Sequence, residues 1–83
     1  LLRQFENLKN GRSHSFLEEE SFERLINYFD EKEDLQQALQ AVELGIEIYP
    51  YSSVLLIKKA DILLATRHYN EALTVLEKAE LLD

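Results

Sequence analysis

Apolar residues recur three or four positions apart along most of this chain, which is the spacing of one face of an α-helix. Glycine and proline, which punctuate strands and turns, number only three together. We therefore expect an all-α protein of about five helices. Their inward side chains are expected to be Leu1, Leu2, Phe5 and Leu8; Phe22, Leu25, Ile26 and Phe29; Leu35, Ala38, Leu39, Val42, Gly45, Ile46 and Tyr49; Leu56, Ala60, Leu63 and Leu64; and Tyr69, Ala72, Leu73, Leu76 and Ala79.

Local signals place the ends of the first two helices. Asn10 and Gly11 supply the residue types that end a helix in a left-handed conformation. Ser15 followed by Glu18 has the spacing of a capping box, in which two side chains satisfy free backbone groups at a helix start. We expect the second helix to run from about residue 17 to residue 31.

The later helices have similar signals. Asp34 is expected to cap the third helix, and Pro50 ends it because proline lacks the donor that a helix interior needs. Ser52 or Ser53 is expected to cap the fourth. Connections of only a few residues make neighbouring helices antiparallel, so the pattern predicts a row of helical hairpins.

Composition narrows the classes of partner and of chemistry. The formal net charge is −7, and residues 21–50 carry seven acidic and two basic side chains, so the chain should repel nucleic acid and anionic membranes. No apolar run approaches the roughly 20 residues that span a bilayer. The absence of cysteine excludes disulfides, thiolate zinc sites and a cysteine nucleophile. We expect a soluble protein and, on this basis alone, a cytoplasmic one.

The chain repeats itself at a shift of 34 residues. The shift aligns side chains of similar size rather than identical ones, and side-chain size is what helix packing depends on. The aligned pairs are Phe22 with Leu56, Ile26 with Ala60, Phe29 with Leu63, Leu35 with Tyr69, Ala38 with Ala72, Val42 with Leu76, and Gly45 with Ala79.

This period and this alternation of large and small positions resemble the tetratricopeptide repeat family. Lys59 stands where the family has leucine, Ile26 is larger than the usual small residue, and the consensus tryptophan is absent. The resemblance implies a solenoid of antiparallel helical hairpins with a right-handed superhelical twist. It divides the chain into an N-terminal helix and loop (residues 1–18) and two repeats (residues 19–52 and 53–83). An unrelated helical bundle with chance self-similarity is the alternative.

The resemblance also implies a binding surface, because the first helix of each repeat in this family lines a concave groove. The corresponding residues are Glu20, Glu23, Asn27, Asp30, Glu31, Val54, Ile57, Asp61, Leu64 and Ala65. Their mixture of acidic and apolar side chains favours a protein or peptide partner with lysine or arginine near one end and apolar residues near the other. Acidic runs such as residues 18–20 and the acidic cluster at residues 30–34 are more often only solvated helix faces and charges at helix N-termini.

One subtype of the family binds chaperone tails through lysine, arginine and asparagine on these helices. Asn27 matches that pattern, but Glu23 stands where a lysine is expected and Lys58 where an asparagine is expected. That subtype is therefore disfavoured.

Two repeats are fewer than the three or so that usually bury a continuous core. The absence of methionine leads us to expect that this sequence is part of a longer chain. Val75, Leu81 and Leu82 are expected to face a further repeat or to mediate self-association of this segment.

Residue patterns for catalysis or metal binding are weak. His14 and His68 lie 54 residues apart without a carboxylate cluster, and the two glycines are isolated. We expect no cofactor, no metal and no enzyme activity. The leading hypothesis is a non-catalytic protein interaction module; a structural spacer or self-association segment is the alternative, and an accessory domain of an enzyme stays open.

Overall fold

A computed structural model describes residues 1–11 and 17–82, and all the regular secondary structure in them is α-helical. The helices are α1 (Leu2–Lys9), α2 (Glu19–Glu31), α3 (Leu35–Ile48), α4 (Ser53–Ala65) and α5 (Tyr69–Leu82). The described residues contain no strand, which confirms the all-α prediction and the number of helices for that part of the chain.

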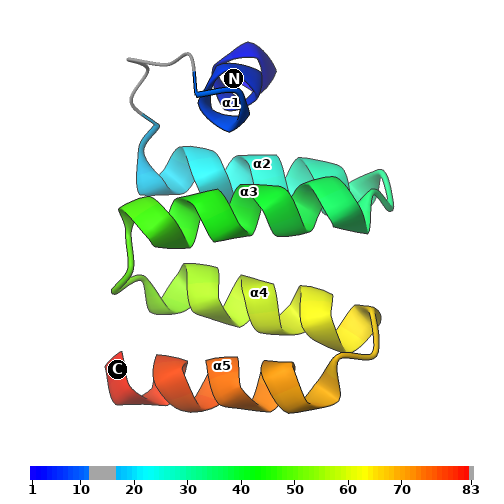
Figure 1. The fold of residues 1–83 in the computed structure, drawn as a ribbon, viewed down its shortest axis with the longest axis vertical. Coiled ribbons are helices and arrows are strands. Elements are labelled where there is room, and N and C mark those ends of the chain that lie inside the picture. The colour runs from blue at the N-terminus through cyan, green and yellow to red at the C-terminus, as the bar shows by residue number, and fades with distance from the viewer. Residues whose placement is uncertain (12–16, 83) are drawn as a thin grey trace.

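The four longer helices are stacked in chain order (Figure 1). α2 packs against α3, α3 against α4, and α4 against α5. α1 is different because it crosses the end of the stack beside α2 and α3, so that it is seen nearly end-on in the view that shows the others side-on. The stack is 33 Å along its longest axis, and the two chain ends lie at opposite ends of it.

The turns inside the two hairpins share one geometry at the 34-residue shift. The left-handed residue is Glu33 in the first turn, with φ of 59°, and Arg67 in the second, with φ of 66°. In each turn the next residue donates its backbone N–H five residues back, from Asp34 to the Phe29 carbonyl at 2.9 Å and from His68 to the Leu63 carbonyl at 2.8 Å. These bonds satisfy carbonyl groups that the end of a helix leaves free. The sequence repeat is therefore also a repeat of backbone structure.

Two helix starts are capped as predicted. The Asp34 carboxylate accepts a hydrogen bond from the backbone N–H of Gln37 at 3.2 Å, and the Ser52 hydroxyl accepts one from Leu55 at the same distance. α3 ends at Ile48, two residues before Pro50. The loop between the hairpins is therefore set by a proline stop followed by a serine cap.

The start of α2 differs from the prediction. The helix begins at Glu19, and Glu18 is its N-cap residue with no side-chain capping bond. A capping box would place Glu18 inside the first turn of the helix, so the predicted capping box was wrong. Its other member, Ser15, lies outside the described residues. Gly11 has φ of 68°, which confirms a left-handed residue just after α1.

The core lies where the helices face one another. All four residues predicted to point inward from α2 are buried, and α1 joins this core through Phe5, which is fully buried with its ring centroid 5.6 Å from that of Phe29. Gly45 lies at a tight contact of α3 with both of its neighbours. A Cβ atom built on Gly45 would lie 3.1 Å from the side chains of both Phe22 and Leu55, so a larger residue there would require α2 or α4 side chains to shift.

Some expected core residues are exposed instead. Leu1 and Leu2 of α1, Leu64 of α4, and Tyr69 and Leu73 of α5 were predicted to face inward, but each has a largely exposed side chain. Other residues are buried without having been predicted, namely Leu17, Ala41, Leu55 and Ile62. Helical period identifies an apolar face but not which neighbours cover it. α1 and α5 lie at the ends of the stack, and α4, although packed between α3 and α5, still has an uncovered side that includes Leu64.

Candidate partner-binding groove

A hollow of about 80 Å³ lies between α2 and α4, the first helices of the two hairpins. Asn27 and Asp30 line it from α2, and Lys58, Asp61 and Ala65 line it from α4. Ile26 and Ile62, both buried, form its apolar floor. We call these seven residues the α2–α4 groove.

One hydrogen bond crosses the groove. The Lys58 ammonium donates to the side-chain carbonyl oxygen of Asn27 at 2.9 Å, at the protein surface. This leaves the two N–H donors of the Asn27 amide pointing to a ligand or to solvent, since the described residues offer them no acceptor. Lys58 is a groove residue that the sequence reasoning missed. The sequence did contain a signal for this position. Lys58 lies one turn before Asp61 and Ile62, so its side chain is on the side of α4 that faces α2.

The charge of the groove is mainly acidic. Asp30 and Asp61 are both exposed, and their carboxylates make no hydrogen bond or ion pair with the described residues. Lys58 is the one basic residue of the groove lining, and its ammonium group is held by Asn27. The groove therefore carries two unpaired carboxylates beside a single cation that is already engaged, so its charge suits a cationic ligand group.

Of the ten residues predicted for the binding surface, the structure brings four together in this hollow: Asn27, Asp30, Asp61 and Ala65. The other six do not line it. Glu20 and Glu31 are exposed and Glu23 is half-buried, all on α2. The remaining three, Val54, Ile57 and Leu64, lie on α4.

These three apolar residues form an exposed stripe on α4. Val54, Ile57 and Leu64 expose 42%, 41% and 44% of their surface. With Asp61 they follow the spacing i, i+3, i+7 and i+10, which is one face of a helix. Because Asp61 belongs both to this stripe and to the groove lining, the two surfaces are continuous. We call Val54, Ile57 and Leu64 the α4 stripe.

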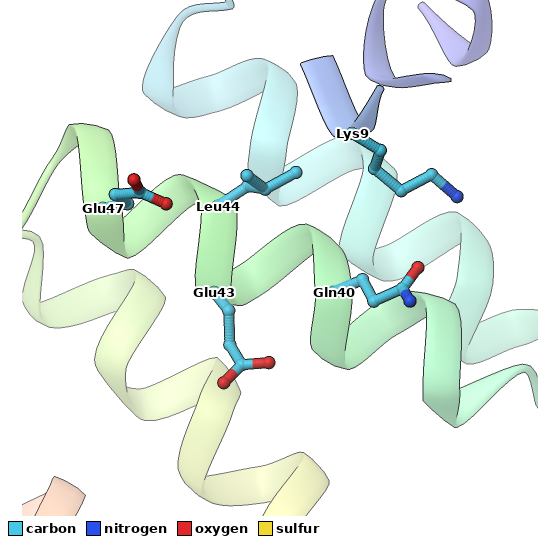
Figure 2. A pocket seen from close by; sticks show the side chains of 5 residues that line it. All are labelled: Lys9, Gln40, Glu43, Leu44 and Glu47. Carbon is cyan, nitrogen blue, oxygen red and sulfur yellow. The ribbon is translucent and has the colours of Figure 1, made fainter. Parts of the chain in front are cut away.

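A larger hollow of about 300 Å³ lies on the outer side of α3 beneath the end of α1 (Figure 2). It is lined by Lys9, Gln40, Glu43, Leu44 and Glu47. Although this hollow is larger, it is the weaker candidate for a partner-binding site. Its lysine and one of its two glutamates already contact other residues of the chain. Glu43 lies 3.8 Å from Lys59 of α4, and only Glu47 is left without a partner among the described residues.

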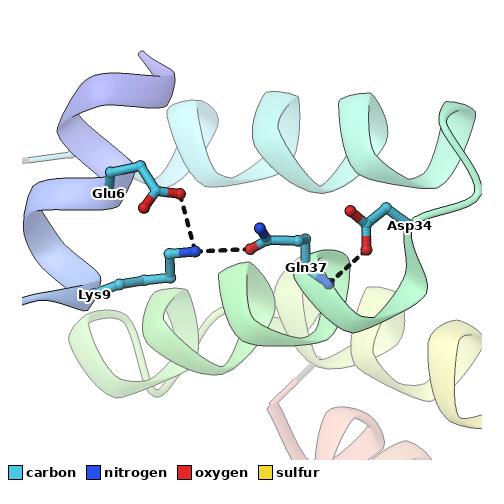
Figure 3. A network of polar contacts seen from close by, with 4 residues as sticks. All are labelled: Glu6, Lys9, Asp34 and Gln37. Atoms are coloured by element: carbon cyan, nitrogen blue, oxygen red, sulfur yellow. Dashed lines mark hydrogen bonds and ion pairs between the residues drawn. The ribbon is translucent and has the colours of Figure 1, made fainter.

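The basic group of that hollow belongs to a structural contact (Figure 3). The Lys9 ammonium lies 3.0 Å from the Glu6 carboxylate, donates to the side-chain carbonyl of Gln37 at 2.8 Å, and lies 4.8 Å from the centre of the Phe5 ring. These contacts join α1 to the first turn of α3. Lys9 therefore helps to hold the crosswise helix in place.

The residues predicted for a further repeat do not form one surface. Val75 is half-buried and lines a separate hollow on α5 with Asn70, Glu71 and Thr74. Leu81 is 86% exposed and Leu82 is partly exposed. The side chains of Val75 and Leu81 point to different sides of α5, so this set was not a single face.

The described residues give little support for a metal-binding or catalytic site. Among residues 1–11 and 17–82, no three histidine or acidic side chains lie close enough together to hold a metal ion. His68 is exposed, with its Nδ1 atom 2.8 Å from the Thr66 hydroxyl. His14 lies outside the described residues. No helix in the described ranges is both long and apolar enough to cross a membrane.

Comparisons with protein-family models, with curated proteins and with solved structures each find no match to this chain. The function of the chain must therefore be inferred from its own structure.

Proposed function

We propose that this chain is a non-catalytic interaction module, built as two tetratricopeptide-like hairpins of a solenoid, that binds an extended peptide or a partner protein across α2 and α4. The proposal is supported by the 34-residue repeat, which recurs in side-chain size, in the left-handed turn residues and in the backbone bonds of both turns. A repeated hairpin places its first helices side by side, which is how α2 and α4 come to share a groove.

The observation that carries the proposal is the continuity of the acidic α2–α4 groove with the exposed α4 stripe. Half-exposed apolar side chains in a row provide anchors for apolar ligand groups. The unpaired carboxylates of Asp30 and Asp61 provide acceptors for lysine or arginine. The expected ligand therefore carries a basic residue that enters the groove and apolar residues that lie along α4.

The test is a selection of random twelve-residue peptides displayed on phage against the immobilised chain. Selected peptides should be enriched in a lysine or arginine near apolar residues. Their binding should be lost in a variant carrying both Ile57→Lys and Leu64→Lys, because two cations then replace the apolar anchors and repel the ligand. Circular dichroism establishes that the variant keeps its helices.

A matched control makes the same residue changes outside the α4 stripe. Leu2 and Ile48 are 43% and 41% exposed, close to the exposure of Leu64 and Ile57. A variant with Leu2→Lys and Ile48→Lys should bind the selected peptides as well as the unmodified chain does. Equal binding by the α4 stripe variant and the control would overturn the proposal and favour a structural spacer or self-association segment.

A further inference from the structure

The hydrogen bond across the α2–α4 groove joins a cation to a neutral acceptor. The Lys58 ammonium donates to the side-chain carbonyl oxygen of Asn27 at 2.9 Å, and this side chain makes no other polar contact with the described residues. No carboxylate of the described residues is within ion-pair distance of Lys58, although Asp30 and Asp61 line the same hollow. The lysine of the groove is therefore held by a single neutral amide.

This bond can be exchanged at little cost. A lysine side chain is flexible and its ammonium group is strongly hydrated, and the pair with Asn27 lies at the protein surface. When Lys58 leaves Asn27, water can take the place of the amide oxygen, so the hydrogen bond to the ammonium is replaced rather than lost. A ligand donor can therefore displace Lys58 from Asn27.

Lys58 also sets the charge that a ligand meets. The charged residues of the groove lining are Asp30, Asp61 and Lys58, so the hollow carries two negative charges and one positive charge. A lysine or arginine that enters between the carboxylates must come close to the Lys58 ammonium, because all three residues line one hollow of about 80 Å³. Two cations in one small hollow repel each other. Lys58 thus already holds the acceptor and carries the charge that suit a basic ligand residue.

We infer that Lys58 is an internal competitor for the basic residue of the ligand. Its ammonium holds the Asn27 oxygen in the free protein and moves out to solvent when a lysine or arginine enters the groove. It thereby weakens ligands that rely on a basic residue alone and favours those that also contact the α4 stripe. The inference rests on the proposed function, because it concerns the same groove and the same class of ligand.

The test uses the full chain and one peptide from the phage selection, chosen because it contains a single lysine or arginine and labelled with a fluorophore. Lys58→Met removes the positive charge and keeps an unbranched side chain with a similar helix propensity. It should tighten binding about twofold to fivefold in fluorescence anisotropy, the range of a surface charge pair. The gain should shrink in about 1 M sodium chloride, because salt screens the repulsion.

Three comparisons isolate the charge of Lys58. Lys78→Met, the same change at an exposed position on α5, should leave the affinity unchanged. Lys58→Arg keeps the charge and should not tighten binding. A copy of the peptide with norleucine in place of its basic residue should bind the unmodified chain and the Lys58→Met variant equally. The double-mutant cycle then assigns the gain to repulsion between the two cations.

The outcomes separate this inference from the proposed function. Selected peptides without basic residues, or binding that survives Ile57→Lys combined with Leu64→Lys, would overturn both. Binding that depends on the α4 stripe but is unchanged or weaker in the Lys58→Met variant would overturn the inference alone, and a weaker affinity would mean that Lys58 donates to the ligand. An equal gain with the norleucine peptide would also overturn the inference, because Lys58 would then act through packing.

Discussion

The two hairpin turns each place a charged residue in the left-handed region, and replacing it with glycine should stabilise the protein. Glu33 has φ of 59° and Arg67 has φ of 66°, where a Cβ atom crowds the following carbonyl oxygen. Glycine has no Cβ and is the usual residue at this position after a helix. We expect both Glu33→Gly and Arg67→Gly to raise the free energy of unfolding.

The magnitude follows from two opposing terms. Relief of the left-handed conformation contributes about 1–2 kcal/mol. The greater backbone freedom of glycine in the unfolded chain costs about 0.5–1 kcal/mol of that gain. The net gain therefore lies between about 0 and 1.5 kcal/mol per turn, with a central value of about 0.75 kcal/mol. For a domain of this size the central value corresponds to a rise in melting temperature of roughly 3–6 °C.

The assay is thermal and urea denaturation followed by far-ultraviolet circular dichroism, with Arg24→Gly as the matched control. Arg24 is an exposed residue in the middle of α2, so glycine there should lower the free energy of unfolding by about 0.5–1 kcal/mol. The two arginine changes thus have opposite expected signs. Equal losses of stability from Arg67→Gly and Arg24→Gly would refute the left-handed turn, and with it the repeat of backbone structure.

Two further predictions concern the docking of α1 and the cap of α4. Phe5→Ala should reduce the free energy of unfolding by about 3 kcal/mol, because it removes a fully buried ring from the contact that holds α1. Leu2→Ala, on the exposed side of α1, should change the free energy of unfolding by less than about 0.5 kcal/mol. Urea denaturation measures both, and similar effects of the two changes would contradict the docking of α1. Ser52→Ala should cost about 1 kcal/mol through loss of the hydrogen bond to Leu55, and Ser53→Ala, whose hydroxyl does not cap the helix, should cost clearly less in a thermal melt.

The lining of the α2–α4 groove was only partly predictable from the sequence. Asn27, Asp30, Asp61 and Ala65, four of the ten predicted residues, line one hollow because the 34-residue shift assigns equivalent positions to α2 and α4. Lys58 was missed because its role depends on the distance across to Asn27, which is set by how closely the two helices approach. The reach of a side chain from one helix to another is a property of the packing and not of either helix.

Lys59 illustrates the same limit. In the sequence it is a departure from the repeat pattern, a charged residue at a position where leucine is expected. In the structure it lies 3.8 Å from Glu43 on the neighbouring helix, so the charge has a partner. Only the position of α3 beside α4 explains why a lysine is tolerated there.

The sequence by itself determined the helical class, the number of helices, most of their ends and the length of the repeat. These features depend on contacts between residues close together in the chain, such as the carboxylate of Asp34 on Gln37 and the stop before Pro50. The tertiary structure alone decided which apolar faces are covered, because burial depends on the number of neighbouring helices. It buried Leu55 and Ile62 between two helices and left Tyr69 and Leu73 exposed at the end of the stack.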